Sequence, residues 1–223
     1  MIDTKAKLLV AAAETVREDG VASASARTIA ARAHVNQALV FYHFGTVSDL
    51  LQASCRQAVD DSADHYRDQL AAVTSLTGLL AVGRELHERE RALGNLAMMA
   101  QFMSGAQHDA GLASAARYAM SRWTTEIESV VARVLTGSPL ADIAAAADLA
   151  RAISAAFVGL ELYDGVDADG AARALAVLEN LGVLLEVMND LGPTTRRALR
   201  SKIRHIRNAN TPPDRTSAHR RPS

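Results

Sequence analysis

Residues 25–50 read SARTIAARAHVNQALVFYHFGTVSDL and predict two short helices joined by a tight turn, followed by the start of a third helix. Their apolar residues are spaced so that both short helices can share one small core. These residues are Ile29, Ala30, Val35, Val40 and Phe44. The outward side of the second short helix then carries amide, aromatic and histidine side chains. The segment is therefore predicted to be a helix-turn-helix.

The outward side of the second short helix is suited to a DNA major groove. Gln37 is the strongest candidate for reading a base edge, because a Gln side chain can form two hydrogen bonds with adenine. Ala38 and Leu39 can offer methyl groups to a thymine methyl, and Tyr42 and His43 can bond phosphates. These side chains predict contact with double-stranded DNA.

The first short helix offers a second contact with the DNA backbone. Its N-terminus carries unpaired N–H groups and a partial positive charge, which attract a phosphate. Arg27 could contact that phosphate, or it could pair with Glu18 or Asp19. Phe41 could likewise face DNA or pack in the core. The candidate DNA-binding residues are Ser25, Arg27, Thr28, Asn36, Gln37, Ala38, Leu39, Phe41, Tyr42 and His43.

At these residues the sequence resembles the DNA-binding domain of the TetR family of bacterial transcriptional regulators. The positions that carry the resemblance are Arg27, Ile29, Ala30, Ala33, Val35, Phe44 and Leu50. Two positions depart from the family pattern. His34 stands where the family usually has a glycine with positive φ, and Val47 stands where it usually has a phosphate-contacting Lys. The resemblance implies a homodimer that binds a palindromic operator and is released by a ligand.

Composition predicts an all-α protein, since 49% of the 223 residues are hydrophobic and only 4% are aromatic, with abundant Ala and no convincing strand pattern. The one cysteine, Cys55, excludes a disulfide within the chain and favours a cytoplasmic location. No run approaches eighteen apolar residues, so no contact with a membrane is expected. No nucleotide-binding loop or catalytic serine motif occurs, so neither an enzyme nor a cofactor or metal is expected.

The chain divides into three expected parts. Residues 1–47 are the helix-turn-helix DNA-binding domain, and residues 48–207 form a helical bundle for ligand binding and dimerisation. Residues 208–223 are expected to be a disordered tail. Residues 191–223 carry nine Lys or Arg and one Asp, so this end could also attract DNA without regard to sequence.

An effector pocket is expected within the bundle, as the resemblance implies. Methionine side chains are flexible and line adaptable apolar sites well, although the same residues could form an ordinary core. The candidate lining residues are Tyr66, Met99, Phe102, Met103, Tyr118, Trp123, Ile127 and Phe157. Their character predicts a small, largely apolar effector.

The segments from about Ala141 to Tyr163 and from Ala171 to Met188 are unusually apolar. A helix that is apolar on two sides must bury both, so one side needs a partner. In the family the equivalent helices form the dimer interface. The candidate interface residues are Ile153, Leu160, Leu178, Leu181 and Leu185, with Phe157 as a further candidate. An alternative function is a helical ligand-binding or heterodimerising module with weakened DNA contacts, which His34 and Val47 would favour.

Overall fold

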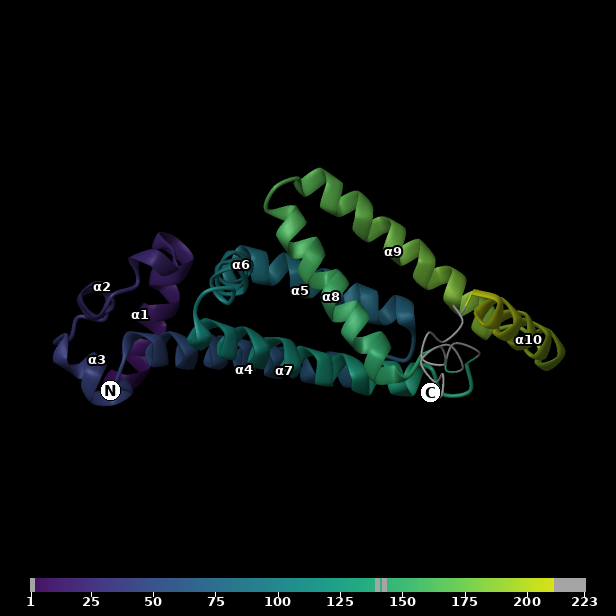
Figure 1. Cartoon of the computed structure of the whole chain (residues 1–223), viewed down its shortest axis with the longest axis horizontal. Helices are drawn as coiled ribbons and strands as arrows, with labels where there is room; N and C mark the ends of the chain where they lie inside the picture. Colours follow the sequence, from purple (N-terminus) through teal and green to yellow (C-terminus); the bar gives the residue numbers. More distant parts are fainter. Residues whose placement is uncertain (1–2, 139–140, 142–143, 211–223) are drawn as a thin grey trace, which may run out of the picture.

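The structure is a computed structural model that describes residues 3–138, 141 and 144–210. Within these residues every regular element is a helix, which confirms the predicted all-α class (Figure 1). The helices are α1 (Thr4–Asp19), the 3-10 turn η1 (Val21–Ser23), α2 (Ala26–Arg32), α3 (Ala38–Phe44), α4 (Val47–Ala72), α5 (Leu76–Ala92), α6 (Asn95–Gly105), α7 (Ala110–Val134), α8 (Ala146–Asp164), α9 (Ala168–Asn189) and α10 (Pro193–Asn210).

Local sequence signals fix the limits of α2. Ser25 Oγ accepts the Thr28 backbone N–H, and Thr28 Oγ1 accepts the Ser25 N–H, so the two residues form a capping box. The turn after α2 places His34 at a φ of 54°, the conformation that the family's glycine would adopt without strain. The helix-turn-helix therefore tolerates a non-glycine residue at this turn.

Two polar caps and one glycine set the limits of α3 and α4. Asn36 Oδ1 accepts the Ala38 backbone N–H at 2.8 Å, so Asn36 caps the turn that enters α3. Gly45, at a φ of 81°, ends α3. Thr46 then caps α4 by accepting the Asp49 N–H. Asn36, Gly45 and Thr46 therefore mark where α3 begins and ends and where α4 begins.

The two longest helices, α4 and α7, run side by side in the same direction along the molecule (Figure 1). A ladder of polar contacts joins them: Arg56 with Ser114, Asp60 with Tyr118, and Asp64 with Arg122. The three N-terminal helices lie at one end of this pair and α10 lies toward the other (Figure 1). The α4–α7 pair therefore extends from the N-terminal helices along the length of the bundle.

One core crosses the boundary predicted at residue 47. Leu8, Ile29 and Val40 are fully buried together with side chains from α4, α6 and α7. From beyond residue 47 this cluster includes Leu50, Leu51, Cys55, Met98, Phe102, Leu112 and Ala115. A second core, built around Tyr66, Val130 and Val131, lies farther along α4 and α7. The N-terminal helices thus share their packing with the bundle.

Helices α8 and α9 complete the bundle. Helix α8 crosses α5 and packs on α7, and α9 returns along α8 and α5 (Figure 1). Arg84 on α5 donates to Glu179 on α9 at 2.9 Å, and the Thr77 backbone N–H donates to Glu186 at 2.8 Å. These contacts fix α9 against α5.

Helix α10 continues to Asn210, so residues 208–210 of the predicted disordered segment are helical. Residues 211–223, which hold the rest of the predicted disordered segment, lie outside the described residues. None of the helices in the described ranges is both long enough and apolar enough to cross a membrane.

Candidate nucleic-acid interface and internal cavity

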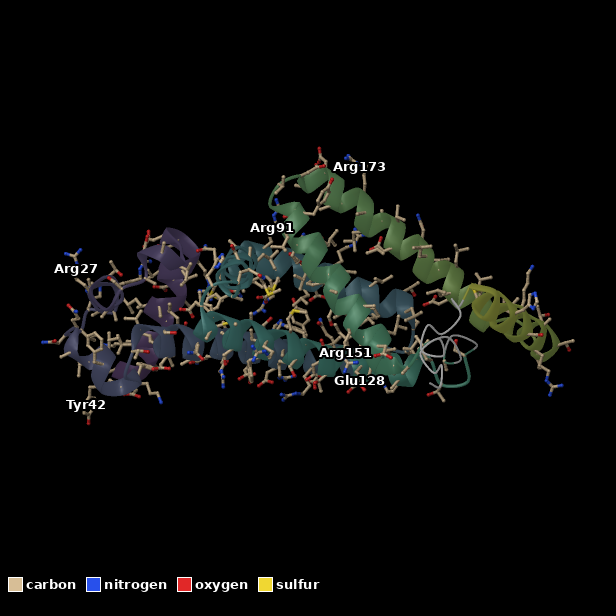
Figure 2. All side chains as sticks on the ribbon, viewed as in Figure 1. Arg27, Tyr42, Arg91, Glu128, Arg151 and Arg173 are labelled. Carbon is tan, nitrogen blue, oxygen red and sulfur yellow. The ribbon has the colours of Figure 1, made fainter. Side chains whose placement is uncertain are left out.

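The outward side of α3 lies at the free end of the molecule. Gln37 and Ala38 are exposed at its start, and Tyr42 is 81% exposed. Figure 2 shows Arg27 and Tyr42 at this end, with their side chains directed away from the bundle. The structure thus gathers side chains from α2 and α3 on one accessible surface.

Arg27 is available to a phosphate. Glu18 and Asp19, the acids considered as its partners, are instead bound by Arg32. Among the described contacts Arg27 has no ion pair or side-chain hydrogen bond, and its side chain is exposed. The free guanidinium lies in the first turn of α2, where the helix N-terminus also attracts an anion.

Several predicted DNA-binding residues also have structural roles. The side chains of Ser25 and Thr28 cap α2, and Asn36 caps the entry to α3, although all three are exposed. Leu39 is partly buried against the N-terminal core, so it has less area to offer a thymine methyl. His43 is partly buried as well.

Phe41 is 49% exposed, which favours the surface alternative over core packing. The ten candidates lie on α2, on α3 or in the residues that lead into these two helices. Among the polar candidates, Gln37, Tyr42 and Arg27 are the three with exposed side chains that have no described hydrogen-bond partner.

A cavity of about 390 Å³ lies inside the bundle. Helix α4 lines it with a stripe of residues at helical spacing: Cys55, Ala58, Val59, Ser62, Tyr66 and Leu70. Helices α5 to α9 contribute the remaining wall, which is almost entirely apolar. Seven of the eight predicted lining residues are present there: Tyr66, Met99, Phe102, Met103, Trp123, Ile127 and Phe157.

Tyr118 does not line the cavity, so its assignment to the pocket is wrong. Its hydroxyl donates to Asp60 at 2.8 Å, and Arg56 stacks 4.9 Å from its ring centre. Tyr118 therefore belongs to the polar ladder between α4 and α7. The hydrogen bond to Asp60, together with desolvation, raises the pKa of the Tyr118 hydroxyl.

Most of the predicted dimer residues face inward. Ile153, Leu160, Leu178 and Leu185 line the cavity; Leu160 is buried and the other three are partly buried, so these side chains have less area to offer a second copy. Leu181 also touches the cavity but is 49% exposed. The helix period explains this result, because residues three, four or seven apart lie on the same side of a helix. On α8, Ile153 and Leu160 share a side with Phe157, which lines the cavity. On α9, Leu178 and Leu185 share a side with Leu175, which also lines it.

The exposed apolar residues of α9 lie on its other side. They are Val177, Leu181, Val183, Leu184 and Val187. Leu162, Tyr163 and Val166, at and just beyond the end of α8, are exposed as well. Composition could indicate that α9 is apolar on two sides, but it could not indicate which side the bundle would cover.

Sequence reasoning missed Glu90, the one charged side chain among the described residues that line the cavity. It is only 7% exposed. Ser62 donates to its Oε1 at 2.8 Å, Arg89 donates to the same oxygen at 3.0 Å, and Asn95 donates to Oε2. A usable signal was present: Glu90 continues the apolar stripe of Leu79 and Leu86 at helical spacing.

Helix α6 connects the cavity to the N-terminal helices. Arg17 Nε on α1 donates to Asn95 Oδ1 at 2.9 Å. Gln101 donates to the Val16 carbonyl at 3.0 Å and accepts the Val21 N–H at 2.6 Å. Asn95 lines the cavity, so one residue contacts both the cavity and α1.

Comparison with known proteins agrees with this geometry. Residues 8–54 match the model of a family described as bacterial regulatory proteins, tetR family. An HTH-type transcriptional regulator of Mycobacterium bovis is 26% identical over 136 residues, which cover 61% of this chain and 69% of the relative.

Solved structures share the fold. A transcriptional regulator from Rhodococcus sp. Rha1 superposes with a TM-score of 0.65 at 23% identity, over 85% of this chain and 100% of the other. A transcriptional regulator from Saccharomonospora viridis, solved in complex with choline, superposes with a TM-score of 0.63 at 19% identity, over 77% and 93% of the two chains. The resemblance to the TetR family is thus confirmed.

Proposed function

We propose that this chain, a DNA-binding transcriptional regulator with a TetR-family N-terminal domain, is a repressor whose homodimer binds a near-palindromic operator and is released by an apolar effector. The observation that carries the proposal is Asn95, which contacts both the cavity and α1. A molecule that enters the cavity can therefore act on the helices that present α3. In this proposal residues 1–47 bind DNA and residues 48–207 bind ligand and dimerise, in the cytoplasm.

The exposed surface of α2 and α3 supports DNA binding. Two copies would place their α3 helices in successive major grooves, about 34–36 Å apart. Gln37 would read a base, while Arg27 and the N-terminus of α2 would hold a phosphate. Val47 is partly buried against the N-terminal core and supplies no charge, so we expect one phosphate contact fewer than a Lys would give.

The exposed face of α9 supports the homodimer. Val177, Leu181, Leu184 and Val187 follow one another at intervals of three or four residues, so they lie on one side of the helix. A contiguous apolar patch on an otherwise polar surface marks an interaction site. We assign this side of α9, rather than the cavity-facing leucines, to the contact with a second copy.

The cavity supports control by a small molecule. Its volume and apolar wall fit a molecule of modest size that is buried on most of its surface. The S. viridis relative was solved with choline, so a protein of this fold can hold a small organic molecule. For this chain we expect an effector that is largely apolar.

The test of DNA binding is selection from a random duplex pool, followed by gel shift of the selected sequence. Gln37→Ala should lose about 1–3 kcal/mol of discrimination at one base pair per half-site, while nonspecific binding is retained. Gln107→Ala, which removes an exposed glutamine between α6 and α7, is the matched control. If no sequence is enriched at physiological salt, the alternative of a module with weakened DNA contacts is favoured instead.

The test of dimerisation is sedimentation of the full chain. Leu184→Lys should shift the population to monomer, because it places a charge in the proposed apolar interface. Val10→Lys changes an equally exposed residue on α1 and should leave the dimer intact. Dissociation by both variants, or by neither, would contradict the assignment of the α9 face.

A further inference from the structure

We propose that the cavity takes an apolar molecule ending in a hydrogen-bond donor, an alcohol or an amine, and that the Glu90 carboxylate accepts this donor. The inference rests on the proposed function, because it names the chemical class of the effector. The polar groups of the cavity wall support this assignment.

Glu90 occupies a position that folding alone does not favour. It lies in the last turn of α5, where the partial negative charge of the helix C-terminus disfavours an acid. It is also buried beside an apolar space, where a charge is costly unless it is paired. Three donors from Ser62, Arg89 and Asn95 hold the carboxylate in this place. The wall thus keeps an acceptor where an apolar residue would pack more simply.

The carboxylate still has room for a fourth donor. Two carboxylate oxygens offer about four acceptor sites. Oε1 accepts from Ser62 and Arg89, whereas Oε2 accepts from Asn95 alone among the described contacts. The remaining site of Oε2 can therefore receive a donor from a molecule in the cavity.

The hydroxyl groups of the wall add acceptors instead of donors. Ser62 already donates its proton to Glu90, Ser154 donates to the Ala150 carbonyl at 2.8 Å, and Tyr66 donates to the Glu85 carbonyl at 3.4 Å. No Lys, Arg or His is found among the described residues that line the cavity. An apolar molecule ending in a carboxylate would bring a second negative charge toward Glu90 and find no cation on the wall. The cavity should reject such a molecule.

Charge alone should not suffice for binding. Arg89, 3.0 Å from Glu90, already balances the charge of the carboxylate. A quaternary ammonium ion has a positive charge but no N–H, so it cannot fill the vacant site of Oε2. We therefore expect selection for the donor and not for the cation.

The donor also acts on the contact that leads to α1. Asn95 shares Oε2 with the incoming donor and holds Arg17 through its other side-chain atom. A second donor on Oε2 would compete with the Asn95 amide for this oxygen and weaken that hydrogen bond, so Asn95 could shift and its bond to Arg17 would weaken. Binding at Glu90 is thereby coupled to the position of α1 and of the helix-turn-helix behind it.

The experiment uses five probes that each carry a linear ten-carbon chain: decanol, decylamine, decyl methyl ether, decyltrimethylammonium and decanoate. Trp123, the one tryptophan of the sequence, lines the cavity, so its fluorescence in the full-length protein reports binding directly. Decanol and decylamine should bind at least about tenfold more tightly than the ether or the quaternary ion, as expected for a hydrogen bond to a charged group. Decanoate should bind most weakly.

Two variants assign the preference to Glu90. Glu90→Leu should bind decanol and the ether equally, and the penalty for decanoate should shrink. Glu88→Gln removes a neighbouring but exposed acid of α5 and should keep the wild-type order of affinities. Because Glu90→Leu removes three hydrogen bonds, its helical content and its unfolding midpoint in urea are measured alongside. Glu90→Gln, which is expected to weaken the preference for decylamine, repeats the test.

The outcomes separate this inference from the proposed function. If all five probes bind alike, or if Glu90→Leu keeps the preference, the donor assignment is overturned while the cavity remains a ligand site. If no probe changes Trp123 fluorescence, the assignment of this ligand class is overturned as well. In both cases operator binding in the gel shift still tests the DNA-binding proposal independently.

Discussion

The N-terminal core and the bundle interior are built from the same kind of helices, but one is filled and the other is hollow. In the N-terminal core, small residues such as Ala11, Ala12 and Ala30 let α1 and α2 approach closely, and Leu8 and Ile29 fill the rest. In the bundle, flexible methionines such as Met99 and Met103 line open space. The two regions therefore differ in how completely the side chains at the helix contacts fill the space between helices, and not in how readily their residues form helices.

The two regions meet at α6. Met98 and Phe102 belong to the N-terminal core and also line the cavity. A change in the hollow region is therefore passed to the filled region through shared side chains. Since close-packed interiors transmit displacement instead of absorbing it, the filled core should move as one body.

The largest expected difference between the regions is the cost of losing side-chain volume. Ile29→Ala should destabilise the protein by about 2–5 kcal/mol, because it opens a void in a filled core. Met103→Ala should cost about 1 kcal/mol or less, because its side chain already borders open space. Urea unfolding of both variants measures the difference, and equal costs would show that the cavity is collapsed in solution.

Cys55 lies where the two regions meet, since it belongs to the N-terminal core and also lines the cavity. Burial raises the pKa of its thiol from 9.0 to about 11, although Arg56 opposes the shift. At pH 8 the thiolate fraction should be about 100-fold lower than in the unfolded chain, and labelling by iodoacetamide should slow by at least that factor. Labelling as fast as in urea would show that this border opens readily.

A third comparison adds volume to each region. Ala12→Leu should cost about 1–3 kcal/mol, because it overpacks a fully buried site. Ala119→Leu, directed at the cavity, should be nearly neutral for stability and should weaken binding of decanol. Unfolding midpoints and Trp123 titrations provide the two readings, and a large stability loss in Ala119→Leu would argue against an open cavity.

The smallest expected effect concerns a buried acid of α8. Glu161 is 5% exposed, its Oε2 has no described hydrogen-bond partner, and its other oxygen lies 2.7 Å from His87 Nδ1. Burial raises the pKa of Glu161, an effect that the hydrogen bond to His87 and the charge of Arg91 oppose and that Asp164 reinforces.

A raised folded-state pKa means that the carboxyl supports folding below its unfolded pKa of about 4.5 and loses that contribution as the pH rises through the folded value. Glu161→Gln lacks this loss, so its stability relative to wild type should increase between pH 4 and pH 7. Urea midpoints at the two pH values measure the change, with Glu88→Gln as the exposed control. A difference that stays constant with pH would contradict the burial of Glu161.

The sequence predicted the helix-turn-helix and seven of eight cavity residues, but not which sides of α8 and α9 the bundle covers. The tight turn that His34 occupies depends on neighbours a few residues away, so a local pattern predicts it. The faces of α8 and α9 depend on which side the bundle covers, and apolar residues on both sides leave that choice to tertiary packing.

The same reason explains two single residues that were misjudged. An aromatic ring suggested that Tyr118 lines the pocket, yet its hydroxyl finds Asp60 on a neighbouring helix. Glu90 resembles an ordinary surface acid of a charged helix until its neighbours across the cavity are known. Partners that lie far apart in sequence decided both cases.

The polar ladder between α4 and α7 pairs each residue with the one 58 positions later: Arg56 with Ser114, Asp60 with Tyr118, and Asp64 with Arg122. Such a constant offset fixes the register of two parallel helices. An insertion or deletion within one helix alone would mismatch every pair beyond it, whereas the same change at matching positions in both would preserve the pairing. The lengths of these two helices are therefore expected to change together or not at all in related sequences.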